Sequence, residues 1–294
     1  MKVLNYGSLN IDHVYQVDTI VQPGQTIASL GVNIFPGGKG MNQSIALARA
    51  GVPVYHAGNI GADGLFMKQL LEQAGADCTW LRVLDMGSGS TFIQVDKHGQ
   101  NCIVLNGGSN QANTRDYVDE VLSHFGAGDM ILLQNEISCT DYIIDRAYEK
   151  GIRIVLNPSP MNDTILSCNL GKVSLFLMNE DEGMAITGKE EPSDILAAMA
   201  RMYPNAQTVL TLGAKGSVYQ GNSRILKQKA FRVSAVDTTA AGDTFTGYFL
   251  AGLARGYDVA LCLEQGAKAA AIAVTRPGAS TSIPTWEEVR AAAL

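Results

Sequence analysis

The sequence predicts an α/β fold with a central, mostly parallel sheet flanked by helices. Short apolar runs alternate with longer stretches of helical periodicity along the 294 residues, a pattern typical of βαβ units. Hydrophobic residues make up 46% of the chain and charged residues 17%, which supplies a sizeable core and argues against intrinsic disorder. No internal repeat or low-complexity segment interrupts the alternation.

The individual elements follow from these runs. The first strand, KVLNYG at residues 2–7, ends in a glycine, and Gly51 ends the first helix. The predicted strands are residues 2–7, 53–61, 129–136, 153–160, 173–180 and 207–213. The predicted helices are residues 41–51, 64–75, 139–151 and 192–203, and a further helix begins at residues 240–242.

Two stretches lack helical periodicity. Residues 13–36 predict two or three short strands around Pro23 and Gly24, and residues 90–105 predict a hairpin that turns at residues 97–99. The two stretches pair into a small accessory sheet, or they are edge strands and long surface loops. The pattern alone leaves both possibilities open.

Composition and charge exclude several classes of function. The formal net charge of −6 argues against a nucleic-acid-binding protein, which usually has a basic face. The sequence has neither a signal-peptide pattern nor an apolar run of membrane-spanning length, so we expect no membrane partner. The five cysteines form no C-x-x-C pair and the four histidines show no metal-ligand spacing, which predicts reduced thiols in a cytoplasmic protein.

The first glycine-rich segment is FPGGKGMNQS at residues 35–44. It is not a P-loop, because Lys39 is followed by Gly40 instead of Ser or Thr, and no G-x-G-x-x-G dinucleotide fingerprint follows the first strand. Its three glycines allow the backbone to approach a ligand just before a helix N-terminus. The alternative interpretation is a tight strand-to-helix turn.

The second segment, DTTAAGDTF at residues 237–245, lies where an extended pattern becomes helical. Small residues at a helix N-terminus leave free amide groups and the positive end of the helix dipole for an anion. Asp243 falls in the first turn, where its carboxylate could accept a proton from an attacking hydroxyl. Singly, Asp243 could be an ordinary N-terminal acid and Asp237 a turn residue; their combination with the small residues favours a site.

Together these motifs resemble the ribokinase-like (PfkB) family of carbohydrate kinases. The similarity covers nearly the whole chain, because the motifs occur in the family's order from residue 7 to residue 284. They are GSLNID (7–12), GGKGMNQS (37–44), NEDE (179–182), TLGAKG (211–216), DTTAAGDTF (237–245) and TRPGASTSIP (275–284). The resemblance implies the family's Rossmann-like α/β core with a small β-sheet lid.

The resemblance also implies a role for each matching position. Asp243 would be the catalytic base, and Ala240, Ala241 and Gly242 would form the anion hole. The sugar would contact Asn10, Asp12, Gly38, Lys39, Asn42, Glu136 and Asp243, and ATP would contact Asn179, Thr211, Gly213, Gly216 and Gly242. Glu182 would organise Mg²⁺, through water, and a K⁺ site would comprise Asp237, Thr239, Ala273, Arg276, Gly278 and Ser282.

The family's lid gives the two irregular stretches a function. The kinase core would comprise residues 1–12, 37–89 and 106–294, and the lid residues 13–36 and 90–105. A lid over the sugar would exclude water, which otherwise competes as phosphoryl acceptor. In many relatives the lids of two subunits pack together, and a homodimer here would use apolar residues of the lid. These are Val14, Ile34, Phe92, Ile93 and Ile103, which otherwise pack within their own lid.

The expected function is therefore ATP-dependent phosphorylation of a small sugar, with Mg²⁺ and K⁺ as cofactors. The Lys of GGKG and the AAGD form of the second motif most resemble ribose kinases, which implies D-ribose as substrate and ribose 5-phosphate as product. Met41 and Ser44 stand where ribose kinases more often carry alanine, so fructose, ketodeoxygluconate, adenosine and pseudouridine remain alternatives. A non-catalytic sugar sensor would be expected to lose the base or the anion hole. An oxidoreductase of similar fold would carry the missing dinucleotide fingerprint.

Overall fold

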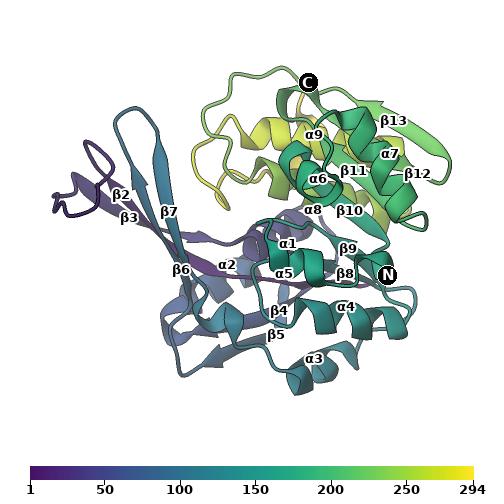
Figure 1. Ribbon diagram of the computed structural model, residues 1–294, viewed down its shortest axis with the longest axis horizontal. Coiled ribbons are helices and arrows are strands. Elements are labelled where there is room, and N and C mark those ends of the chain that lie inside the picture. The colour runs from purple at the N-terminus through teal and green to yellow at the C-terminus, as the bar shows by residue number, and fades with distance from the viewer.

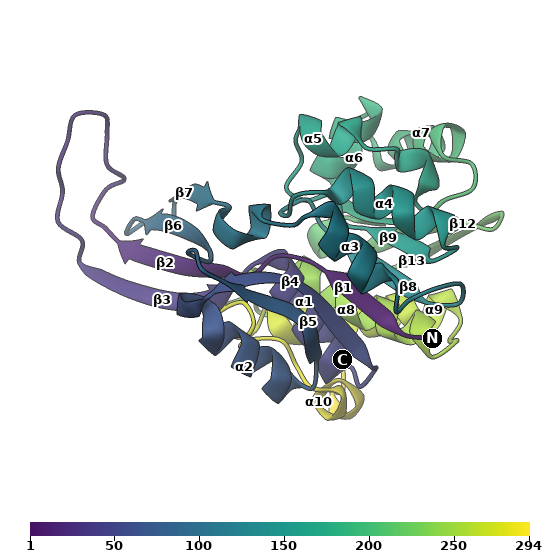
Figure 2. The ribbon, with the colours of Figure 1, turned by 90° about the horizontal axis from the view of Figure 1, so that it is seen from below.

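The computed structural model describes residues 1–294. A nine-stranded sheet forms the centre of the molecule, helices cover both of its faces, and a separate four-stranded sheet projects from one side (Figures 1 and 2). The predicted α/β class, with its small second sheet, is confirmed.

The large sheet is parallel from β11 to β5 and antiparallel at the β11–β12 and β12–β13 pairs. In spatial order its strands are β13 (Arg224–Gln228), β12 (Ser217–Gly221), β11 (Gln207–Thr211), β10 (Leu175–Asn179), β9 (Arg153–Leu156), β8 (Met130–Leu133), β1 (Val3–Tyr6), β4 (Val54–Gly61) and β5 (Asp77–Leu84).

Two layers of helices enclose this sheet, as Figure 2 shows. One layer comprises α1 (Lys39–Arg49), α2 (Leu65–Ala74), α8 (Ala241–Ala254), α9 (Val259–Ala273) and α10 (Trp286–Ala291). The other comprises α3 (Arg115–Leu122), α4 (Thr140–Glu149), α5 (Asp163–Ser167), α6 (Glu180–Thr187) and α7 (Pro192–Met202). No helix is both long and apolar enough to cross a membrane.

The central strands are apolar at consecutive positions because each face of the sheet has its own core. In β1, Val3 belongs to the core under α1 and α8, while the adjacent Leu4 belongs to the core under α3 and α4. Both side chains are fully buried, as expected for a parallel sheet covered on both faces.

The second sheet consists of β3 (Gly31–Gly37), β2 (Asn10–Gln16), β6 (Gly89–Val95) and β7 (Asn101–Asn106), in that order. β2 pairs with β3 antiparallel and with β6 parallel, and β6 and β7 form the predicted hairpin. Between β2 and β3 the chain turns at Pro23-Gly24, where Gly24 has φ of 82° and Gln25 N donates to Gln22 O at 3.0 Å.

The sequence did not predict β5, the β12–β13 hairpin, or helices α3, α5, α6, α9 and α10. β5 and β13 lie at the two edges of the sheet, and their burial is partial and irregular. Neither therefore carries a continuous apolar run.

Candidate active site

The topology of the large sheet positions a crevice at one edge. The chain proceeds from β1 to β4 and β5 on one side and later fills β8, β9, β10 and β11 on the other. In open α/β sheets, ligands bind beyond the carboxyl ends of the strands where the strand order reverses. Polar residues follow the strands at this edge: Gln134 after β8, Asn157 after β9, and Asn179 at the end of β10.

Glycines set α1 against the bend that follows β1. A Cβ at Gly40 would lie 2.3 Å from Ser8 N, and Gly38 has φ of 93°, so both positions require glycine. The close contact allows Met41 N to donate to Ser8 O at 2.9 Å. The N-terminus of α1 therefore lies at the crevice.

The N-terminus of α8 lies at the same crevice. Ala240 precedes the helix with φ of 58°, the left-handed conformation, and Ala241 N donates to Thr238 O. Of the three predicted anion-hole residues, Ala240 and Gly242 have backbone N–H groups without an acceptor within the protein, whereas the N–H of Ala241 is used. The N–H of Asp243, which was not predicted, also has no acceptor. Free amides at the positive end of a helix dipole are the chemistry of an anion site.

Close packing of α1 on α8 brings the two N-termini together. A Cβ at Gly247 would lie 2.3 Å from Ala46 Cβ, so a small residue is needed at this crossing. One turn before the crossing, Asn42 Nδ2 donates to Asp243 Oδ2 at 3.0 Å and Gln43 Nε2 donates to Asp243 Oδ1 at 2.8 Å. The Asp243 side chain is thus oriented at both oxygens, and the residue is only 7% exposed.

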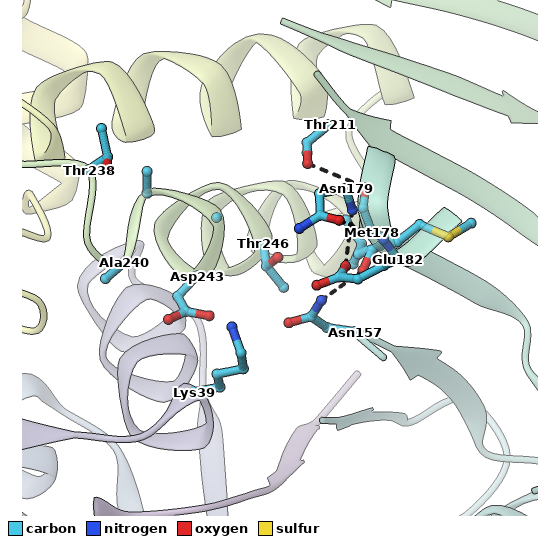
Figure 3. Close-up of a pocket in the computed structure, with 13 residues that line it drawn as sticks. Lys39, Asn157, Met178, Asn179, Glu182, Thr211, Thr238, Ala240, Asp243 and Thr246 are labelled. Atoms are coloured by element: carbon cyan, nitrogen blue, oxygen red, sulfur yellow. Dashed lines mark hydrogen bonds between the residues drawn. The ribbon is translucent and has the colours of Figure 1, made fainter. Parts of the chain in front are cut away.

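A cavity of about 250 Å³ opens beside Asp243 and the start of α8. Figure 3 shows the Lys39 ammonium between Asp243 and Asn157, with Asn179 and Glu182 on the opposite wall. The lining residues are Lys39, Asn157, Leu177, Met178, Asn179, Glu182, Thr211, Thr238, Ala240, Ala241, Gly242, Asp243 and Thr246.

Lys39 is the cation of this cavity. Burial acts to lower the pKa of its ammonium, but the carboxylates of Asp243, Glu136 and Glu182 outweigh burial and raise the pKa above its ordinary value. The side chain therefore remains charged. The resemblance placed Lys39 with the sugar ligands, whereas its side chain lines the same cavity as the α8 amides.

Asn179 and Glu182 form a capping box at the start of α6. Asn179 Oδ1 accepts from Glu182 N at 2.8 Å, and Glu182 Oε2 accepts from Asn179 N at 3.0 Å. The second carboxylate oxygen of Glu182, Oε1, and the side-chain Nδ2 of Asn179 have no protein partner, and both residues line the cavity. One carboxylate facing a phosphate-sized space fits Mg²⁺, which keeps several waters and binds through substrate phosphates.

Five of the seven predicted sugar ligands do not line this cavity: Asn10, Asp12, Gly38, Asn42 and Glu136. Asn10 Oδ1 accepts from Asn110 Nδ2 at 2.7 Å, Asp12 accepts from the Thr91 hydroxyl, and Glu136 accepts from the Ser8 hydroxyl. Glu136 also accepts from Lys39 N at 2.9 Å, so the group adjoins the cavity through Lys39.

Two carboxyl groups in this neighbourhood are perturbed. Burial raises the pKa of Asp12 to about 6, which the Thr91 hydroxyl opposes and the charge of Glu136 reinforces. Burial also raises the pKa of Glu136, against the hydrogen bonds from Ser8 and Lys39. Partly buried acids that accept few protein hydrogen bonds retain capacity for the hydroxyl groups of a ligand.

The predicted K⁺ ligands meet at a junction of two loops before α8 and after α9. Asp237 Oδ1 accepts from Thr239 N at 2.9 Å, and Oδ2 accepts from Gly278 N at 2.9 Å. Burial acts to raise the pKa of Asp237, but the hydrogen bonds from Thr239 and Gly278 lower it. The carbonyl oxygens of Thr239, Arg276 and Gly278 accept no hydrogen bond from the protein. Free carbonyls beside a carboxylate are oxygen donors of the kind that a hard cation requires.

The other two predicted K⁺ ligands, Ala273 and Ser282, already take part in hydrogen bonds within the protein. The Ala273 carbonyl accepts from Arg276 N at 3.1 Å, and Ser282 Oγ donates to Ala279 O at 2.8 Å. Of the predicted nucleotide ligands, Thr211 lines the cavity, while Gly213 and Gly216 lie just beyond it with φ of 53° and 104°.

Sequence reasoning missed Gln43, Asn157, Thr238 and Thr246. Asn157 was detectable, because it is a polar residue directly after a buried strand on the edge where ligands bind. Gln43 lies inside the glycine segment, but its contact with Asp243 spans 200 residues of sequence, and no local pattern predicts it.

The fold and site are those of a phosphotransferase with an alcohol group as acceptor. A sequence profile of the pfkB family carbohydrate kinases matches residues 1–286, and the chain belongs to this family. It is a carbohydrate kinase. The ribokinase of Haemophilus influenzae is 38% identical over 296 residues, which cover 96% of this chain and 95% of that protein.

Two solved structures support the same assignment. The ribokinase of Cryptococcus neoformans in complex with ADP matches with a TM-score of 0.87 and 31% identity, covering 98% of each chain. The ribokinase of Arabidopsis thaliana complexed with ribose and ATP matches with a TM-score of 0.87 and 27% identity, covering 98% of this chain and 97% of that one.

Proposed function

We propose that this carbohydrate kinase transfers the γ-phosphoryl group of ATP to D-ribose and produces ribose 5-phosphate and ADP. The observation that carries the proposal is the position of Asp243 beside the free amides of α8, in a cavity that also contains Lys39 and Glu182. Ribose as the acceptor is supported by the relatives named ribokinase and by the structure complexed with ribose and ATP.

In the reaction, Asp243 accepts the proton of the sugar hydroxyl as its oxygen attacks the γ-phosphorus and the bond to ADP breaks. The amides of Gly242 and Asp243 and the Lys39 ammonium face the charge that develops on the transferred group. Mg²⁺ bound near Glu182 would neutralise charge on the phosphates. Asn179 and Thr211 bind the nucleotide at the cavity wall, and Gly213 and Gly216, which lack side chains, let the nucleotide approach the protein backbone.

The sugar lies on the other side of Asp243, against Asn10, Asp12, Gly38, Asn42 and Glu136. Met41 and Ser44 do not bear on the choice of sugar, because both side chains are fully buried and neither hydrogen-bonds to these residues. Met41 belongs to the apolar core, and Ser44 Oγ contacts Asn5 and His56.

The second sheet, with residues 13–36 and 90–105, acts as a lid on the core formed by the rest of the chain. Strand pairing places Val14, Ile93 and Ile103 on the face that carries Asp12, and Ile34 and Phe92 on the opposite face. We assign the homodimer interface to the Asp12 face. Sedimentation of the wild type against Ile103→Glu tests it: an unchanged dimer, or a wild-type monomer, overturns this assignment.

K⁺ at the Asp237 junction would order the loop that leads into α8. A cytoplasmic location is supported by the five cysteines, all of which are free.

The deciding experiment is a coupled ADP-release assay with Mg-ATP and potassium. The acceptors are D-ribose, 2-deoxyribose, fructose, ketodeoxygluconate, adenosine and pseudouridine. We expect the highest kcat/KM with D-ribose. Faster turnover of another acceptor would keep the mechanism and replace the substrate, and no turnover with any acceptor would favour the sugar sensor.

A further inference from the structure

Behind Asp243 lies a cluster of amide side chains to which the proposed mechanism gives no role; of its members, only Asn157 lines the cavity. Its members are Asn5, Gln43 and Gln134, all at most 1% exposed, and the partly buried Asn157. They come from β1, α1 and the segments after β8 and β9, and they hydrogen-bond to one another.

Gln43 is the only one of these residues that hydrogen-bonds to Asp243. Its Nε2 donates to Asp243 Oδ1 at 2.8 Å and to Asn157 Oδ1 at 2.9 Å, and its Oε1 accepts from Gln134 Nε2 at 2.7 Å. A rotated amide would place Oε1 against two acceptors and Nε2 against a donor. The orientation of Gln43 is therefore fixed by its three partners.

Asn157 extends this connection to the phosphate side of the cavity. Its Nδ2 donates to Leu177 O at 2.9 Å, which anchors it to β10. Figure 3 shows its side chain facing the cavity close to Glu182. One side chain, Gln43, thus joins the carboxylate of Asp243 to the wall that carries Glu182.

The two oxygens of Asp243 are consequently not equivalent. Oδ1 is held from behind by Gln43, and Oδ2 is held by Asn42, a residue that the family resemblance assigns to the sugar. We propose that Gln43 is a positioning residue for phosphoryl transfer. It fixes the rotation of the Asp243 carboxylate so that Oδ2 accepts the proton of the sugar hydroxyl. This inference rests on the proposed role of Asp243 as base.

A purely structural role for Gln43 predicts a different pattern of losses. Any break in a buried amide cluster lowers stability, whichever member is changed. Only a positioning role lowers kcat specifically, because the base is then misdirected while the sugar and ATP still bind. The neighbouring Ser44 is a matched control, because it lies on the same helix, is fully buried, and hydrogen-bonds to Asn5 and His56 without contacting Asp243.

The test compares Gln43→Met with Ser44→Ala, using the acceptor that the wild type phosphorylates fastest. Both variants should lose thermal stability. Gln43→Met should lose kcat by roughly 10- to 100-fold, the cost expected of a misplaced reacting group, with little change in sugar KM. Ser44→Ala should keep kcat. Near-normal kcat in Gln43→Met, or an equal loss of kcat in both variants, overturns the inference.

Two further variants make the result decisive. If Gln43→Met does not fold, Gln43→Glu keeps the acceptor for Gln134 and removes the donor to Asp243; unchanged kcat in that variant also overturns the inference. In an Asp243→Asn background, Gln43→Met should cause little further loss, because residues that act as a unit are not additive. Near-normal turnover in Asp243→Asn alone would refute the proposed base itself, whereas its collapse with full activity in the Gln43 variants would refute only the role of Gln43.

Discussion

Gly242→Ala should abolish most activity without harming the fold. A Cβ at Gly242 meets no atom within 4 Å, and Gly242 lines the cavity at the first turn of α8. The added methyl therefore enters the space that we assign to the transferred phosphoryl group. Replacing glycine with alanine in a helix is stabilising by up to about 1 kcal/mol, so Tm should stay level or rise by about 2 °C.

Activity should fall because the added methyl group would hold the transferred phosphoryl group away from the amides of α8, so that their hydrogen bonds are lost. Losing one such donor costs roughly 10²- to 10³-fold in kcat. The measurement is ADP release at saturating sugar and ATP, together with thermal unfolding of the same preparation. Gly242→Val should lower kcat further.

Gly247→Ala is the matched control in the same helix. Its Cβ would lie 2.3 Å from Ala46 Cβ, so this variant should lose about 1–3 kcal/mol of stability through overpacking. Wild-type kcat in a folded Gly242→Ala enzyme would refute the helix-terminus account. Unfolding of Gly242→Ala with tolerance of Gly247→Ala would refute the packing from which both predictions come.

Three further predictions concern the cation junction, the partly buried Asp12 and the buried His56. Asp237→Ala removes the acceptor for Thr239 and Gly278. Turnover should rise with potassium in the wild type and should not respond to potassium in the variant. Wild-type activity that is unchanged in buffer free of potassium and sodium would contradict the site. The carboxyl of Asp12, whose pKa is about 6, should ionise to accept sugar hydroxyls, so sugar kcat/KM should fall as pH drops below 6, and Asp12→Asn should remove that inflection. Burial lowers the pKa of His56 from 6.5 to about 4, so the stability that comes from keeping the ring neutral is present above pH 6.5 and is lost as pH falls toward 4. The free energy of unfolding, measured by denaturant titration, should fall by on the order of 3 kcal/mol over this range. A His56 variant with the same acid dependence as the wild type would contradict the prediction.

Much of the core could be predicted because each buried strand is an apolar run between helical periods. The run MILL in β8 is fully buried on both faces, and the predicted range 129–136 contains it. The hairpin β12–β13 could not be found in this way, since β13 is largely exposed and its strand carries lysine, arginine and glutamine. Edge strands do not need the pattern on which the prediction relies.

In the site, too, features that depend on neighbouring residues were predictable, and contacts between residues distant in sequence were not. The start of α8 was predictable from DTTAAGDTF alone, because helix termini and small residues are local signals, and the structure begins the helix at Ala241. The side chains that orient Asp243 were not, since Asn42 and Gln43 reach it only through the crossing of α1 and α8. Family resemblance supplied Asn42 with a different partner and left Gln43 without a role.

The lid shows where periodicity is insufficient. The sequence of residues 13–36 and 90–105 left a small sheet and surface loops as equal alternatives, because the strands there expose large apolar side chains on both faces. Ile34 and Ile103 are 59% and 55% exposed, although they belong to opposite faces of the sheet. Alternation of apolar and polar residues, the usual signature of a half-buried strand, is therefore absent.

The most direct test of the central claim is Asp243→Asn, measured for both turnover and sugar binding. The substitution removes the proton acceptor and keeps the shape, so kcat should fall by several orders of magnitude while D-ribose binds with near wild-type affinity in calorimetry. That result is the one predicted for a base held between Asn42 and Gln43. Near-normal turnover of D-ribose by a folded Asp243→Asn enzyme would contradict the account.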